Sequence, residues 1–140
     1  MKTQQIVAYA RDLRKQYNTN DPYKLAEIFG IRVLERKLCK SVKAQTLKVK
    51  GYPTIISINE AYTALSKKVL CAHELGHALL HQEFINHFNI TEENVNTTVE
   101  FEANMFAVAL LCDDEQFIMP VSDMENVLLK SILDYNIKYQ

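Results

Sequence analysis

The sequence predicts an α+β fold in which a small three-stranded, mainly antiparallel sheet packs against a helical core. Two observations favour this class. Apolar residues recur at helical spacing near the N-terminus and again beyond residue 60, whereas residues 31–58 contain short runs that alternate in polarity. A chain of 140 residues is long enough to enclose one hydrophobic core but not two. We therefore expect a single domain over residues 1–140.

Two helices are expected at the N-terminus. Apolar side chains at helical spacing mark one face of the first helix: Ile6, Tyr9, Ala10, Leu13 and Tyr17. The second helix is short and has a signal at each end. Asp21 is a suitable N-cap, Pro22 suits the first helical position, and Gly30 can end the helix in the left-handed conformation.

Three strands are expected next. Residues 31–35 alternate in polarity, and within residues 42–50 Leu47 and Val49 alternate with Lys48 and Lys50. Residues 54–58 form a short β-branched run that is typical of a buried strand. Because no helical segment separates these runs, we expect an antiparallel meander.

The remainder of the chain is mainly helical in pattern. We expect helices over residues 66–82, over residues 97–111, and from about residue 122 to 135, with a polar loop over residues 84–96. Thr97 and Glu100 have the spacing of a capping box, which gives Glu100 a structural role at the start of its helix.

Composition excludes several classes of protein. The net charge of −1 does not favour a nucleic-acid or membrane-surface protein, and no run of 18 apolar residues could span a bilayer. The N-terminal residues lack the apolar core of a signal peptide. Three widely spaced cysteines do not suggest a disulfide framework. We therefore expect a cytoplasmic protein.

Charge is nevertheless distributed unevenly along the chain. Residues 1–68 contain 14 basic and 5 acidic residues, a net charge of +9, whereas residues 69–140 contain 2 basic and 12 acidic residues, a net charge of −10. Two interpretations stay open. Either the two halves pack together and neutralise each other, or the basic half attracts an acidic partner to an acidic, metal-binding half.

The most informative motif is His73-Glu74-Leu75-Gly76-His77, an HExxH sequence within a helical pattern. Residues four apart on a helix are separated by about 40° around the axis and about 6 Å along it, so both imidazoles can bind one zinc ion. Glu74 is then placed to act as the general base on water. Gly76 destabilises a helix by about 1 kcal/mol relative to alanine, which suggests close approach of another element.

A catalytic zinc needs a third protein ligand. We favour Glu102, because it shares an apolar stripe with Phe106 and Ala109, and a buried carboxylate must be paired or bound to an ion. Glu100 is the alternative. His81 lies about 12 Å along the helix from His73, so we expect it to have a structural or supporting role.

Two segments resemble the ImmA/IrrE family of metallopeptidases: CAHELGHALLH at residues 71–81 and EFEANMFAVALL at residues 100–111. The resemblance extends from about residue 21 to 111. It implies a zincin-like core with one Zn²⁺ per chain bound by His73, His77 and Glu102, and Glu74 as the general base. The family commonly continues this second helix with a Leu-Leu-Met-Pro-like segment, whereas this chain has Cys112 and Asp113 after its leucines.

The resemblance also implies a function. Members are cytoplasmic, often belong to phages or mobile elements, and usually act on a helix-turn-helix repressor. No DNA-binding domain is appended here, so we expect no direct contact with nucleic acid and none with membranes. We thus expect a zinc endopeptidase that cleaves such a repressor. The alternative is a catalytically silent, zinc-containing regulator that acts by binding the repressor.

Overall fold

The fold was analysed in a computed structural model that describes residues 1–81 and 97–138. This part of the chain is α+β, with five α-helices and one mixed three-stranded sheet. The elements are α1 (Thr3–Tyr17), α2 (Pro22–Ile28), β1 (Arg32–Arg36), β2 (Ala44–Leu47), β3 (Ile55–Asn59), α3 (Ala64–Leu80), α4 (Thr97–Leu111) and α5 (Asn126–Tyr135), with 3₁₀ turns η2 (Asp114–Gln116) and η3 (Val121–Asp123) between the last two helices.

Most helices begin and end near the predicted positions. Asp21 caps α2 by accepting a hydrogen bond from the backbone of Tyr23 at 2.9 Å, and Gly30 ends the turn after α2 with φ of 74°. The last helix starts later than predicted. Residues 121–123 form η3 instead, and α5 begins at Asn126.

The sheet corrects the predicted meander. Its strand order is β1-β3-β2, with β3 antiparallel to β2 but parallel to β1. β3 takes the centre because it is the most apolar strand and is buried along nearly its whole length, whereas β1 is largely exposed. The sheet is therefore mixed, not mainly antiparallel.

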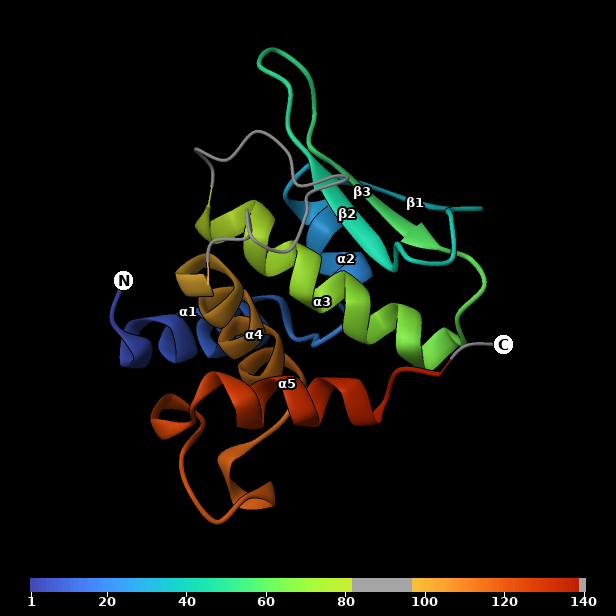
Figure 1. Cartoon of the computed structure of the whole chain (residues 1–140). Helices are drawn as coiled ribbons and strands as arrows, with labels where there is room; N and C mark the ends of the chain where they lie inside the picture. The colour runs from blue at the N-terminus through green and yellow to red at the C-terminus, as the bar shows by residue number, and fades with distance from the viewer. Residues whose placement is uncertain (82–96, 139–140) are drawn as a thin grey trace.

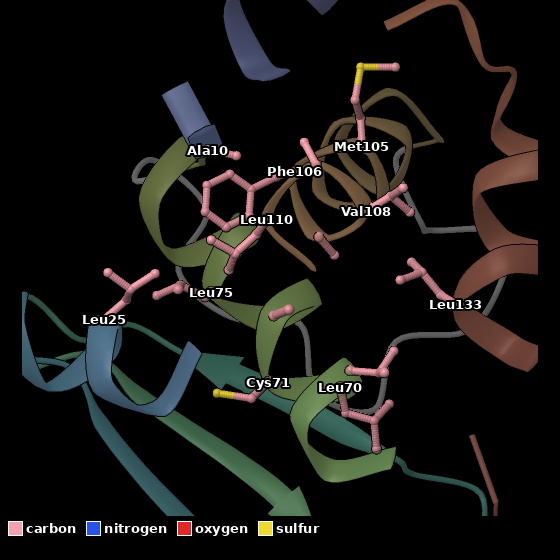
Figure 2. Packing of buried hydrophobic residues seen from close by; sticks show 14 of the residues in the cluster. Ala10, Leu25, Leu70, Cys71, Leu75, Met105, Phe106, Val108, Leu110 and Leu133 are labelled. Carbon is pink, nitrogen blue, oxygen red and sulfur yellow. The ribbon is translucent and has the colours of Figure 1, made fainter. Parts of the chain in front are cut away.

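Helix α3 lies between the sheet and the other long helices (Figure 1). One of its sides packs on β2, β3 and α2, and the other on α4, which in turn contacts α1 and α5. Figure 2 shows Phe106 of α4 among Ala10 of α1, Leu75 of α3 and Leu110, all of them fully buried. The core thus holds α3 and α4 against each other.

The two helices cross at Gly76. A Cβ atom at this position would lie 3.1 Å from the Cα of Ala103 and 3.2 Å from its carbonyl oxygen, both in the backbone of α4. A Cβ atom there would require the backbone of α4 to move by a few tenths of an ångström. The close approach that the unfavourable glycine suggested is therefore confirmed.

Gly76→Ala is expected to lower the free energy of unfolding by about 1–2 kcal/mol. Overpacking costs about 1–3 kcal/mol, and the better helix propensity of alanine recovers only part of this. Chemical denaturation of the metal-free protein measures the change. An alanine variant as stable as the wild type would show that α4 yields without cost.

Basic side chains from the N-terminal half cap both of these helices. The ammonium group of Lys48 donates to the carbonyls of Ala78 and His81 at the end of α3, at 2.9 and 3.1 Å. Arg11 donates to the carbonyls of Ala109 and Cys112 at the end of α4. Cations at these positions complement the negative end of the helix dipole.

Arginine side chains of α1 also form ion pairs with acidic residues that follow α4. Arg11 pairs with Asp114 at 3.1 Å, and Arg14 pairs with Asp113. These contacts favour the interpretation in which the basic and acidic halves neutralise each other. Within residues 1–81 and 97–138, no helix has both the length and the apolar character needed to cross a bilayer.

Candidate metal centre

Helix α3 places His73 and His77 side by side. The residues are one turn apart, and their Nε2 atoms lie 3.1 Å from each other. His77 is almost completely buried, whereas the side chain of His73 is 18% exposed. The predicted convergence of the two imidazoles is present, with the more accessible ring toward the solvent.

Glu100 of α4 completes the group. Its Oε1 lies 3.1 Å from Nε2 of His73, and its Oε2 lies 2.8 Å from Nε2 of His77. Ligand atoms bound to one tetrahedral zinc ion are separated by about 3.3 Å, so these spacings are close to those of a shared ion. Among the described residues, His73, His77 and Glu100 form the one group of three or more potential metal ligands.

This geometry favours the alternative residue, Glu100, over the predicted Glu102 as the third ligand. Oε1 of Glu102 lies 2.8 Å from Nε2 of His81, one turn beyond His77, and not at the meeting point of the first two histidines. Glu102 is indeed largely buried and paired, as its place on an apolar stripe required. Its partners are the imidazole of His81 and the N-terminal ammonium group of Met1 at 3.5 Å, whereas Glu100 faces the site.

The electrostatics of the group suit a cation. Burial alone would raise the pKa of Glu100, but hydrogen bonds from His73 and His77 hold that pKa well below its usual value. Burial would likewise lower the pKa of His73, yet Glu100 and the charge of Glu74 raise it overall. An ionised carboxylate and two neutral imidazoles would direct three lone pairs to one point, which is stable only with protons or a metal ion between them.

The donor set fits zinc. Two imidazole nitrogens and one carboxylate oxygen form the ligand set of catalytic zinc sites, which keep a fourth position for water or substrate. Glu100 and His73 are partly exposed, so that position has access to the solvent. We therefore consider these residues able to hold one zinc ion.

Glu74 lies beside the histidines and is held by the sheet. Its Oε1 accepts a hydrogen bond of 2.6 Å from the hydroxyl of Thr46 in β2. This hydrogen bond fixes one side of the carboxylate. Glu74 is only 7% exposed, but it lies in the wall of a cleft and so still borders open space.

The cleft has a volume of about 530 Å³ and runs between α3, α4, α5 and the start of β2. His73, Glu74 and Glu100 lie in its wall, and Lys43 and Lys130 contribute positive charge. Two of the potential metal ligands and the expected base therefore face one shared space that is large enough for a short segment of a substrate.

Asn104 of α4 supports His73 and is itself bound by Asn126 of α5. Asn104 is buried and hydrogen-bonds to the His73 side chain, which helps to raise the pKa of that histidine. Nδ2 of Asn104 donates to Oδ1 of Asn126 at 2.8 Å. Thr46 and Asn126 were not predicted, because they reach the site only through tertiary packing. The predicted loop at residues 84–96, including His87, lies outside the described residues.

A cleft bordered by His73, Glu74 and Glu100, with His77 buried beside His73, defines a candidate metal-dependent hydrolase. Comparison with known proteins agrees with this class. The chain belongs to the Peptidase M78 family, described as the IrrE N-terminal-like domain, whose sequence model matches residues 26–130. Membership in this family indicates a metallopeptidase.

A relative from a phage is also known. The chain is 35% identical over 112 residues to the uncharacterized immunity region protein 2 of Bacillus phage phi105, an alignment that covers 78% of this chain and 69% of the relative. Both findings confirm the resemblance to the ImmA/IrrE family.

Proposed function

We propose that this protein is a zinc-dependent endopeptidase that cleaves one specific protein, a helix-turn-helix repressor of a phage or mobile element. The observation that carries the proposal is the meeting of His73, His77 and Glu100 at a cleft whose wall also contains Glu74. A structural zinc site would have no need of an open side or of a neighbouring carboxylate held ready at the cleft.

Each residue has a distinct role in this proposal. His73, His77 and Glu100 hold the ion, which when bound polarises the scissile carbonyl and lowers the pKa of water to about 7. Glu74 removes a proton from the attacking water and delivers it to the leaving amine nitrogen. Thr46 binds one oxygen of Glu74 and thereby directs the other toward the reacting groups.

The border of the cleft is suited to a peptide. Ala44, at the start of β2, lies in the cleft wall, and among the described strands β2 pairs with β3 alone. An extended chain can hydrogen-bond to such a strand edge, and its side chains then point alternately toward and away from the cleft. This supports a protein substrate rather than a small amide.

The choice of a repressor rests on the family resemblance and on the phage relative, whose name assigns it to an immunity region. The test combines the purified chain with a candidate helix-turn-helix repressor, sought among the proteins that neighbouring genes encode. We expect about one zinc ion per chain, one defined cut in the repressor, loss of cleavage with a chelator, and recovery on addition of Zn²⁺.

Two results would contradict the proposal. Cleavage that survives complete removal of zinc would exclude the metal mechanism. A zinc-loaded protein that inactivates the repressor without cutting it would favour the silent regulator.

A further inference from the structure

A line of hydrogen bonds leads away from the candidate metal centre behind His77. Nδ1 of His77 lies 3.2 Å from Nδ1 of His81, and Nε2 of His81 lies 2.8 Å from Oε1 of Glu102. Both histidines are buried, and the side chain of Glu102 is 15% exposed. The three groups join successive turns of α3 to α4.

The direction of each hydrogen bond follows from the chemistry of the last group. An ionised carboxylate can only accept, so Nε2 of His81 must carry the proton that it donates to Glu102. In a neutral imidazole the other nitrogen is then an acceptor, and Nδ1 of His81 accepts from His77. His77 must therefore carry its proton on Nδ1, which leaves the Nε2 lone pair facing Glu100 and His73.

We propose that His81 and Glu102 form a relay that fixes His77 in the one tautomer able to bind the metal ion. The inference rests on the zinc site of the proposed function. Both members are positioning residues, because they act on the ion only through His77.

The relay also distinguishes the two histidine ligands. His73 is supported by the neutral amide of Asn104, whereas His77 is connected through an imidazole to a carboxylate. A carboxylate behind a ligating histidine orients the ring and makes it a stronger donor, and loss of such support typically lowers metal affinity about 10–100-fold. We expect the same range when the relay is broken.

The test compares substitutions at the two relay positions. His81→Phe keeps the size of the ring but removes both nitrogens, and is expected to lower zinc affinity about 10–100-fold. His81→Asn places an amide oxygen where Nδ1 lies, so it should recover most of this loss. Glu102→Gln keeps an acceptor but not the charge, and should lie between wild type and His81→Phe. Glu115→Gln, an exposed position in η2, is the matched control.

Zinc affinity is measured by competition with a chromophoric chelator, and chemical denaturation verifies that each variant is folded. Nitrogen NMR of the zinc-loaded wild type provides a second readout that does not depend on any variant. It is expected to place the imidazole protons on Nδ1 of His77 and Nε2 of His81.

The possible outcomes separate this inference from the proposed function. A wild-type protein that binds no zinc would refute both. A wild type that binds zinc, with unchanged affinity in His81→Phe and Glu102→Gln, would refute the relay alone. A proton on Nδ1 of His81 in the loaded protein would also refute it.

Discussion

Glu74→Gln is expected to leave zinc binding intact and to lower kcat for repressor cleavage by about 10²–10⁴-fold, the usual contribution of a general acid–base residue. The glutamine oxygen can still accept the hydrogen bond from Thr46, so the local structure should persist. An amide cannot take up the proton of the attacking water. The measurements are zinc content and single-turnover cleavage of the repressor.

Glu27→Gln, on the exposed side of α2, is the matched control, because it makes the same chemical change on a helix far from the histidines in sequence. It should cleave at the wild-type rate. A zinc-loaded Glu74→Gln variant with wild-type kcat would show that another group serves as the base. A variant that no longer cleaves but still inactivates the repressor would support regulation by binding.

The second large effect concerns two glutamates that lie two positions apart on α4. Glu100→Gln is expected to lower zinc affinity by more than about 100-fold, beyond the range for residues that only support a ligand. Glu102→Gln should have a smaller effect, because Glu102 contacts His81 and not the converging nitrogens. Both variants lose one negative charge from the same helix, so each controls for the other.

Equilibrium competition for zinc, carried out on both variants under the same conditions, gives the comparison directly. The reverse order, with Glu102→Gln the more damaging, would mean that Glu102 binds the metal and that the arrangement described for Glu100 is wrong.

Local rules predicted much of this site. The HExxH spacing identifies two imidazoles on one side of a helix, and this needs only helix geometry. The close approach at Gly76 was likewise expected from the cost of a glycine within a helix. Both inferences depend on one element, so they did not require knowledge of how the elements pack.

The choice between Glu100 and Glu102 shows where such reasoning ends. The argument that a carboxylate on an apolar stripe needs a partner was correct, since Glu102 is buried and paired with His81. Which partner it meets depends on where α4 crosses α3, and the crossing at Gly76 and Ala103 puts Glu100 beside the first two histidines. Because the capping-box spacing already gave Glu100 a structural role, the sequence argument favoured Glu102 instead.

Strand β2 gives a second example. In the strand predicted within residues 42–50, Leu47 and Val49 alternate with Lys48 and Lys50, which favours burial of the apolar pair, whereas β2 itself ends at Leu47. Instead Thr46 is buried against Glu74, Lys48 reaches the end of α3, and Val49 is 46% exposed. The polar side chains face inward because a carboxylate and the last carbonyls of a helix lie there and require donors. The alternation of polar and apolar residues in the strand gives no sign that these acceptors need hydrogen-bond donors.

The packing of helix α1 determines where the folded domain begins. The stretch shared with the family begins at residue 26, after α1 has ended. Yet Ile6 and Ala10 of α1 are fully buried, and Arg11 satisfies carbonyls at the end of the helix that carries Glu100. A fragment trimmed to the shared stretch would expose the side of α4 that packs against α1 and weaken the support of a proposed metal ligand. The family match and the packing of α1 thus set different boundaries for this domain.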